Sequence, residues 1–200
     1  MSENQRIRIT KQLLKTSLIK LLKTKSINKI SVTAICEDAQ VNRTTFYKYY
    51  GSQYDLFNEM EQDVCEEIGT YLDKCSLASA SAPLTFDALL AESIPYLTQM
   101  FTFIDEHFEL CELLLSGNMS PDFPEKLIRS LNNMPEFTKA HLANIYSEAD
   151  AAYVFDFLIG GCFAFVKKWT KEKCRRKPEE MAQLLAVVTA SLGGLDLSEL

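Results

Sequence analysis

The chain has 200 residues, of which 47% are hydrophobic and 24% are charged, so it can bury a core of ordinary globular composition. The six cysteines form no CxxC pair and neither histidine lies near two of them, which argues against a metal site. The sequence contains no nucleophile elbow, zinc-protease motif, phosphate-binding loop or dinucleotide fingerprint. We therefore expect no enzymatic activity and no cofactor.

The net charge of −6 conceals an uneven distribution along the chain. Residues 1–50 contain ten Lys or Arg and three Asp or Glu, a local charge of +7, and the remainder carries −13. A basic head on an acidic body indicates a local site for a polyanion such as nucleic acid. A solvated basic surface without a partner is the alternative interpretation.

The basic head is predicted to form three helices. An apolar stripe predicts the first helix over residues 8–24, at Leu14, Leu18, Leu21 and Leu22. The second helix should begin after Ser31, a candidate N-cap, and the third after Asn42. The side-chain oxygen of Asn42 can accept the free N–H of Thr44 or Thr45. The turn between these two helices contains Gln40.

The third helix is predicted to have two chemically different faces. Phe46 and Tyr50 lie four residues apart on the apolar face. The opposite face carries charged, hydroxyl and phenol groups, on Arg43, Thr44, Tyr47 and Lys48. Such a short helix is suited to contact a polar partner. Ser52 and Asp55 then resemble a capping box that begins a fourth helix.

The rest of the chain is predicted to be helical, with no strand alternation, so the expected fold class is all-α. The fourth helix should cover residues 52–75, followed by a small, polar loop at 76–83. Apolar spacing predicts further helices, with Pro95 kinking or interrupting the first, over about 85–104, 108–116, 121–134, 148–174 and 178–192. Residues 137–145 extend this helical region.

No apolar leader opens the sequence, and the longest uncharged run, residues 181–195, is too short to span a membrane. We expect a soluble, cytoplasmic protein with reduced thiols and no membrane partner.

Residues 31–57 resemble the helix-turn-helix of TetR/AcrR-type transcriptional regulators. The family pattern is matched at Thr33, Ile35, Ala39, Val41, Thr45-Phe46-Tyr47 and Ser52. The resemblance is dense over about 50 N-terminal residues and architectural beyond them. This chain departs from the family at three places. It has Gln40 in place of a turn Gly, Tyr49-Tyr50 in place of His-Phe, and Gln53 in place of a Lys that contacts phosphate.

The resemblance implies a three-helix DNA-binding domain over residues 1–51 and a helical effector-binding and dimerisation domain over 52–200. It implies a ligand-responsive repressor that binds double-stranded DNA at a palindromic operator as a homodimer. The implied major-groove contacts are Arg43, Thr44, Thr45 and Tyr47, with Thr33 from the preceding helix and Ser31, Lys48 and Tyr49 on phosphates. A protein-interaction module with a vestigial head is the alternative.

For the body, the resemblance implies a small-molecule pocket, whose candidate lining is Tyr96, Met100, Phe101, Phe108, Phe123 and Tyr153. Because the body is acidic and rich in aromatic residues, we expect an apolar effector, of unknown identity. The alternative is a tightly packed body without a ligand. The last two helices would form the dimer interface, through Gly160, Gly161, Phe165, Leu184 and Val188, or would simply complete the core of one subunit.

Overall fold

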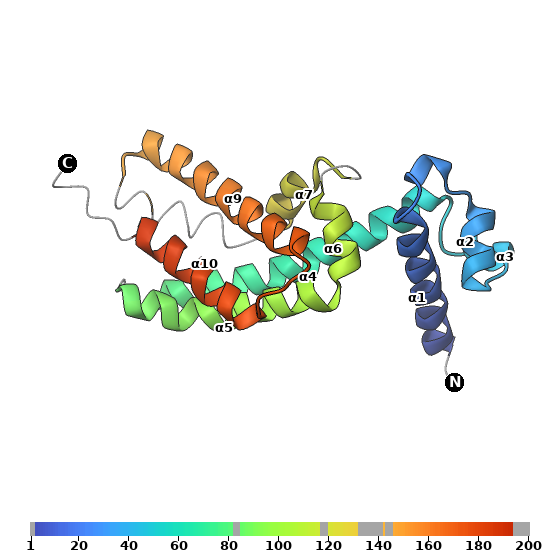
Figure 1. Cartoon of the computed structure of the whole chain (residues 1–200), viewed down its shortest axis with the longest axis horizontal. Coiled ribbons are helices and arrows are strands. Elements are labelled where there is room, and N and C mark those ends of the chain that lie inside the picture. Colours follow the sequence, from blue (N-terminus) through green and yellow to red (C-terminus); the bar gives the residue numbers. More distant parts are fainter. Residues whose placement is uncertain (1–2, 82–84, 117–119, 132–141, 143–145, 194–200) are drawn as a thin grey trace.

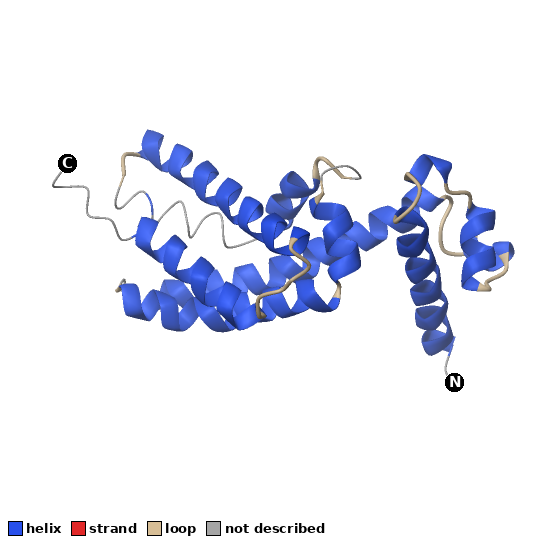
Figure 2. Ribbon diagram, in the orientation of Figure 1, coloured by secondary structure: helices blue, strands red, loops and turns tan. Residues whose placement is uncertain are grey.

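The computed structural model describes residues 3–81, 85–116, 120–131, 142 and 146–193, and every regular element within them is helical (Figure 2). The all-α fold class is confirmed. The elements are α1 (Glu3–Leu22), η1 (Ile27–Lys29), α2 (Val32–Ala39), α3 (Arg43–Phe46), α4 (Gln53–Ser81), α5 (Phe86–Glu106), α6 (Phe108–Leu115), α7 (Phe123–Ser130), α9 (Glu148–Lys171) and α10 (Pro178–Gly193).

The long helix α4 joins two unequal parts of the molecule (Figure 1). At one end, α1, α2 and α3 form a small head around the beginning of α4. In the body, α5 packs against both α4 and α10, α7 packs against α4, and α9 packs mainly against α6. The helices α2 and α3 therefore lie at one extremity of the molecule, and the end of α10 lies at the other.

The core of the head forms where the apolar stripe of α1 meets α2 and α3. Leu14, Leu18, Ile35 and Phe46 are completely buried. Burying each such side chain contributes about 1.5–3 kcal/mol relative to leaving it exposed. Within this core, the Ser17 hydroxyl donates a hydrogen bond to the Ile35 carbonyl at 3.1 Å, so its polar atom is satisfied.

The predicted caps of the helix-turn-helix are confirmed. The Ser31 hydroxyl accepts from the Ala34 N–H at 3.1 Å, and the Asn42 side chain accepts from the Thr44 N–H at 2.8 Å. Gln40, in the turn, adopts the left-handed conformation with φ 54° and ψ 39°.

The beginning of α4 is held by a variant of the expected capping box. The Ser52 hydroxyl accepts from the Asp55 N–H at 3.3 Å, as expected. The Asp55 carboxylate accepts in return from the Gly51 N–H at 2.9 Å, one residue earlier than in the standard motif.

The predicted loop after α4 is wrong, and of the two effects predicted for Pro95, a kink or an interruption, the interruption is wrong. The stretch expected to form a loop from residue 76 continues α4 as far as Ser81, because its alanines and serines include no residue that breaks a helix. The helix α5 continues through Pro95, although a proline removes one backbone hydrogen bond and costs about 3 kcal/mol in a helix interior. Packing of α5 between α4 and α10 offsets that cost.

Smaller differences concern element ends. The first helix begins at Glu3 rather than near residue 8, and α7 ends at Ser130 rather than near 134. The helical extension expected over 137–145 lies outside the described residues, apart from Leu142.

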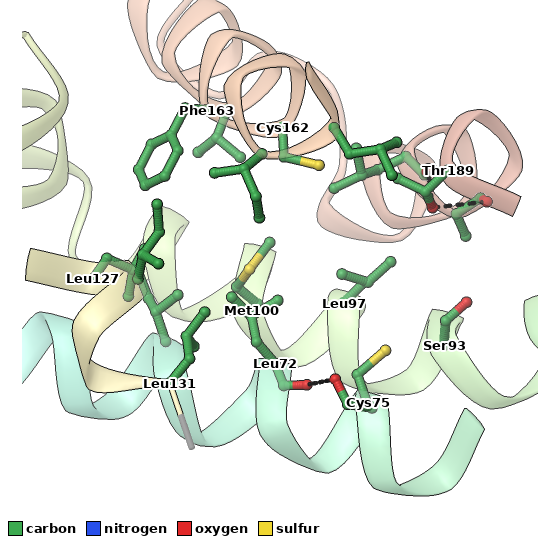
Figure 3. Close-up of a pocket in the computed structure, with 18 of the residues that line it drawn as sticks. Leu72, Cys75, Ser93, Leu97, Met100, Leu127, Leu131, Cys162, Phe163 and Thr189 are labelled. Atoms are coloured by element: carbon green, nitrogen blue, oxygen red, sulfur yellow. Dashed lines mark hydrogen bonds between the residues drawn. The ribbon is translucent and has the colours of Figure 1, made fainter. Parts of the chain in front are cut away.

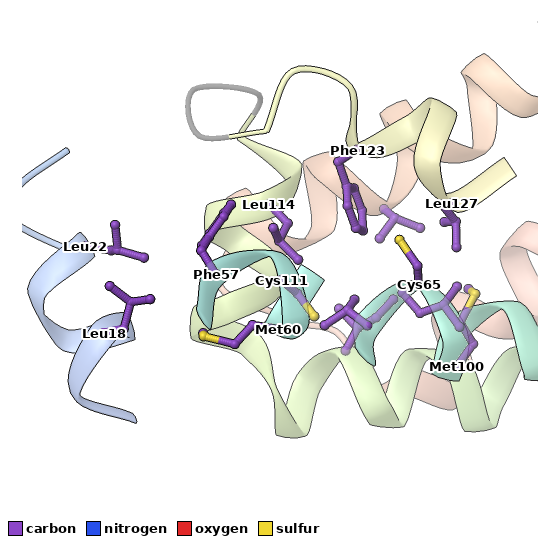
Figure 4. Close-up of a cluster of buried hydrophobic side chains, with 14 of the residues drawn as sticks. Leu18, Leu22, Phe57, Met60, Cys65, Met100, Cys111, Leu114, Phe123 and Leu127 are labelled. Carbon is purple, nitrogen blue, oxygen red and sulfur yellow. The ribbon is translucent and has the colours of Figure 1, made fainter. Parts of the chain in front are cut away.

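A single cluster of apolar side chains runs from the head into the body (Figure 4). It joins Leu18 and Leu22 of α1 to Phe57 and Met60 of α4, and these to Leu114 of α6. The head is therefore packed against the body through α1, α4 and α6, and not only tethered to it by one helix.

Candidate nucleic-acid interface

The polar side chains predicted to contact DNA lie on α2, on α3 and in the turn that follows α3. Arg43, Thr44 and Lys48 are exposed, and Tyr47 is 51% exposed although its ring meets the buried Phe46 edge-on. The remaining candidates are exposed or partly buried: Ser31, Thr33, Thr45 and Tyr49. This surface therefore presents cationic, hydroxyl and phenol groups to solvent.

The regular part of α3 is shorter than predicted. It ends at Phe46, so Tyr47, Lys48 and Tyr49 lie in the turn that follows. The Tyr49 and Tyr50 N–H groups still donate to the Phe46 carbonyl, at 2.9 and 3.0 Å. These bonds keep the turn compact and continue the direction of α3.

A network of hydrogen bonds and ion pairs beneath this surface was not predicted from the sequence. The Tyr50 hydroxyl donates to Glu59 of α4 at 3.0 Å, and Lys11 and Lys15 of α1 each lie 2.8 Å from the same carboxylate. Lys15 also pairs with Asp63 at 2.5 Å, and the Lys11 ammonium lies 5.4 Å from the centre of the Tyr50 ring. Glu59 therefore ties α1 and the end of the α3 segment to α4.

This network changes the acidity of its members. Partial burial alone would raise the pKa of Glu59, but hydrogen bonds from Lys11, Lys15 and Tyr50 outweigh it and lower the pKa to about 2. Burial, followed by the bond to Glu59, raises the pKa of Tyr50 above its usual value. Burial lowers the pKa of Lys15, but its carboxylate partners have the larger combined effect and raise it. Glu59 is therefore ionised and Tyr50 protonated at neutral pH.

One sequence signal could have located this network. The family pattern has Phe where this chain has Tyr50, and a buried phenol needs a hydrogen-bond partner. Glu59 lies nine residues later, on the first turns of α4.

The ten cations of the head divide into two groups. Four of them pair with carboxylates: Lys11, Lys15, Lys20 (with Asp38) and Lys23 (with Glu109 of α6). Within the part of the chain that the structure describes, no ion pair involves the other six: Arg6, Arg8, Lys25, Lys29, Arg43 and Lys48. The second group is available to neutralise phosphates.

The body contains an apolar cavity of about 260 Å³ (Figure 3). Met100 and Phe123 line it, as predicted. Phe101 is instead completely buried against Trp169, with ring centres 5.1 Å apart, and Tyr153 is 79% exposed on α9. Tyr96 and Phe108 also lie outside the lining, which is formed mainly by leucine and other aliphatic side chains and not by the predicted aromatic ones.

The predicted dimer residues divide between the surface and the core. A Cβ added at Gly160 or Gly161 would meet no described atom within 4 Å, so neither glycine accommodates another helix of its own chain. Leu184 and Val188 of α10 are 39% and 44% exposed. Phe165, in contrast, packs its ring against Phe101 inside the subunit.

Residues Ala149–Lys171 are long and apolar enough to cross a membrane, by length and composition, and 17% of the most apolar window is buried in the subunit. The same properties describe a helix whose apolar surface is covered by another protein chain, so they do not identify a membrane span.

Comparison with known proteins identifies the family. Residues 17–60 match the family model described as bacterial regulatory proteins of the tetR family, and residues 92–190 match a transcriptional regulator C-terminal region. The chain belongs to the TetR family of transcriptional regulators. Together the two models cover the end of α1, the helices α2 and α3, the beginning of α4 and most of the body.

Solved structures show the same fold over nearly the whole of this TetR-family chain. A tetR-family regulator from Streptomyces coelicolor has a TM-score of 0.63 at 17% identity, with 96% of this chain and 82% of that chain covered. A TetR-like regulator from Rhodococcus sp. RHA1 has a TM-score of 0.62 at 18% identity, with 93% and 97% covered.

The fatty acid degradation regulator FadR from Bacillus halodurans has a TM-score of 0.59 at 15% identity, with 92% of this chain and 95% of that chain covered. At such identities the likeness shows the fold alone. No curated protein sequence matches this TetR-family regulator significantly.

Proposed function

We propose that this TetR-family regulator is a cytoplasmic homodimer that binds a palindromic operator in double-stranded DNA and represses transcription until an apolar effector enters the body. The observation that carries the proposal is the exposed polar surface of α3 and its turn, where Arg43 and Lys48 form no ion pair with any described carboxylate. Repression requires only that the bound dimer exclude other proteins from the same DNA.

In this proposal α3 enters the major groove. Arg43, Thr44, Thr45 and Tyr47 reach base edges, and Thr33 approaches from α2. Ser31, Lys48 and Tyr49 contact phosphates; the Ser31 hydroxyl accepts the Ala34 N–H and keeps its own proton to donate. An Arg side chain can make a bidentate contact with guanine, worth about 1–3 kcal/mol of discrimination.

Selection of bound fragments from genomic DNA tests this assignment directly. We expect an enriched palindrome, and we expect Arg43→Ala to relax the preference at one position of each half-site. Arg129→Ala, at an exposed position of α7 in the body, is the matched control and should leave the preference unchanged. A selection without any enriched sequence would contradict the proposal and favour a protein-interaction module.

A second copy of the chain is the proposed partner of the α9–α10 surface. This surface exposes large apolar groups, including Phe157 at 67% and Leu184, Val187 and Val188 at about 40%. A two-fold dimer would cover these groups, and two heads would then read the two halves of a palindrome. Sedimentation at micromolar concentration should show a dimer.

Effector control is proposed to act through the separation of the two heads. Because α4 extends from the head into the wall of the cavity, a change at the cavity can change head spacing, which must match about 34–36 Å on DNA. An effector that prefers one spacing by 1–3 kcal/mol changes operator affinity about 5–150-fold.

The coupling can be tested by titrating the operator with and without a molecule that stabilises the protein in a thermal-shift screen. Lower operator affinity is expected. Unchanged affinity would exclude the coupling, because linkage between two binding sites is reciprocal. A reporter gene behind the operator should become more active when the regulator is deleted; lower activity would identify an activator.

A further inference from the structure

The cavity in the body has chemically different ends. Toward one end lie the aliphatic and aromatic groups of Leu127, Leu131 and Phe163 (Figure 3). Toward the other end lie Ser93 of α5 and Thr189 of α10. Ser76, near the far end of α4, also belongs to the lining. The hydroxyl groups therefore come from the part of the body farthest from the head.

No charged side chain occurs among the described residues that line the cavity. Three cysteines contribute thiols, and burial raises the pKa of Cys162 to about 11 and the pKa of Cys111 to about 12. These two thiols are uncharged at neutral pH. A carboxylate or phosphate inside the cavity would lose its hydration without gaining a counter-ion, which is strongly unfavourable.

The hydroxyl groups of the lining are already engaged as donors. Thr189 donates to the Leu185 and Ala186 carbonyls, at 2.9 and 3.1 Å, and Ser76 donates to the Leu72 carbonyl at 3.0 Å. A hydroxyl has one proton and two lone pairs, so both oxygens retain capacity only to accept. The hydrogen bond from the Ser93 hydroxyl to the Leu90 carbonyl is longer, at 3.4 Å. Of these hydroxyl groups, Ser93 can therefore most easily donate its proton to a ligand instead.

We propose that the cavity binds a neutral, mainly apolar molecule that carries one hydroxyl group, an alkanol of medium chain length, with that hydroxyl between Thr189 and Ser93. The alcohol O–H donates to the Thr189 oxygen, which accepts no hydrogen bond from a described residue, and the alcohol oxygen can accept from Ser93. The alkyl chain occupies the end formed by Leu127, Leu131 and Phe163.

The size of the cavity agrees with this class of ligand. A dry apolar cavity of about 150 Å³ in another protein binds benzene. The cavity here is about 260 Å³, which accommodates a molecule larger than benzene. The inference rests on the proposed function, since it assigns the chemistry of the effector at the same site.

Four small molecules of nearly equal size test the proposal: octanol, its isomer methyl heptyl ether, nonane and octanoate. Dissociation constants are measured on the full-length protein by displacement of an apolar fluorescent dye. We expect octanol to bind about threefold to tenfold more tightly than the ether, as one net hydrogen bond provides. Octanoate should bind about a hundredfold more weakly than octanol at pH 8.

Variants locate the hydroxyl of the ligand. Thr189→Val has nearly the same shape as the parent residue and removes the acceptor, so it should abolish the advantage of octanol over the ether and leave nonane binding unchanged. Ser191→Ala is the matched control, because Ser191 makes the same kind of bond, to the Val187 carbonyl, on the exposed side of α10.

Four results would overturn the inference: octanoate binding as tightly as octanol, the ether matching octanol, an advantage that survives Thr189→Val, or no binding by any of the four molecules. Operator titration with bound octanol separates this inference from the proposed function. If octanol binds as expected and operator affinity does not change, the cavity chemistry stands and the proposed effector control fails.

Discussion

Gln40 holds the turn of the helix-turn-helix in a conformation that residues with a Cβ rarely adopt. Its φ of 54° lies in the left-handed region, where a non-glycine residue costs about 1–2 kcal/mol. Its N–H donates to the Cys36 and Glu37 carbonyls, so the backbone of the turn is satisfied in spite of the strain. The turn is therefore maintained by the surrounding packing and not by the preference of Gln40.

Replacing Gln40 with glycine should stabilise the protein. We expect Gln40→Gly to raise the free energy of unfolding by up to about 1 kcal/mol, since relief of the left-handed strain exceeds the extra entropy of glycine in the unfolded chain. Urea unfolding measures the change. Glu37→Gly, at an exposed helical position three residues earlier, is the control and should destabilise by about 1 kcal/mol. Equal losses for both variants would show that the Gln40 side chain itself stabilises the turn.

Glu59 makes the stability of the head dependent on pH. Its pKa of about 2 in the folded protein lies below the ordinary value of 4.5, so its stabilisation is complete above pH 4.5 and is lost as the pH falls toward 2. Because the side chain is 30% exposed, we expect a contribution on the order of 1 kcal/mol after solvent screening.

The Glu59→Gln variant should accordingly lose less stability than the wild type between pH 4.5 and pH 2. The measurement is urea unfolding at several pH values in this window. Glu92→Gln, at an exposed position of α5, provides the comparison and should behave as the wild type does. If the free energy of unfolding of the wild type and of Glu59→Gln changed with pH in parallel, the Glu59 carboxylate would have little effect on folding.

At the scale of the elements, local patterns predicted the head well because its signals are chemically specific. Ser31 and Asn42 have short polar side chains that can cap a helix, and each does so. The spacing of Leu14, Leu18 and Phe46 leaves only one face for the core, and all three are buried. Such signals depend on neighbours within one or two turns, which are visible in the sequence.

The features that could not be predicted depend on contacts between distant segments. Nothing in the order of residues pairs Lys23, which follows α1, with Glu109 of α6. The prediction that Phe101 lines the cavity failed for the same reason, because Phe101 fits equally well in a core or a cavity until Trp169 is placed beside it. The helices could be predicted from the residues along each segment. The environment of each side chain could not, because it depends on how the helices pack against one another.

An ion pair between a buried carboxylate of α4 and a partly exposed lysine of α7 connects these two helices. Glu61 of α4 is 3% exposed and lies 2.5 Å from Lys126 of α7, and the Ser120 hydroxyl donates to the same carboxylate. Phe123 and Leu127 of α7 are buried beside this pair and also line the cavity. The position of α7 therefore affects both the stability of the body and the shape of the cavity.

Removing only the cation should be more harmful than removing both charges. Lys126→Met leaves the Glu61 carboxylate buried without its ammonium partner, and we expect a loss on the order of 3 kcal/mol. Glu61→Gln combined with Lys126→Met should recover part of that loss. Thermal or urea unfolding of the two variants and the wild type measures the difference; a double variant less stable than Lys126→Met would show that the pair does not account for the attachment.

At the scale of the whole molecule, the internal pairing of the head determines how many of its cations can act on DNA. Lys11 and Lys15 are held by Glu59, whereas Lys48 has no ion pair among the described residues. Each phosphate neutralised contributes about −0.9 to the slope of log K against log salt concentration. Lys48→Ala should thus make the slope of a bound dimer less negative by about 1.8, one contact from each subunit.

Lys15→Ala is the informative comparison, because it removes the same charge from the same head. It should leave the salt slope nearly unchanged, while lowering stability through the loss of its contacts with Glu59 and Asp63. The measurement is operator affinity at four or five salt concentrations. Equal changes in slope for both variants would mean that the ion pairs of α1 open when DNA binds.

In the proposed dimer, Gly161 would have a role that it does not have within one subunit. A helix-interior glycine costs about 1 kcal/mol relative to alanine, so Gly161→Ala should stabilise an isolated subunit. Gly161→Leu should instead weaken the dimer, by overpacking the surface where the second subunit approaches. Ala152→Leu serves as the control. Ala152 is exposed and precedes Gly161 by nine residues, and at about 100° per residue this places it on the opposite side of α9.

Sedimentation of the three variants, together with Gly160→Leu, separates the possibilities. We expect dissociation at micromolar concentration for at least one glycine-to-leucine variant and an intact dimer for Ala152→Leu. Dimers that resist both glycine substitutions would place the interface elsewhere. An added Cβ at either glycine meets no described atom of its own subunit within 4 Å, so we expect a loss of assembly to arise from contact with the second subunit.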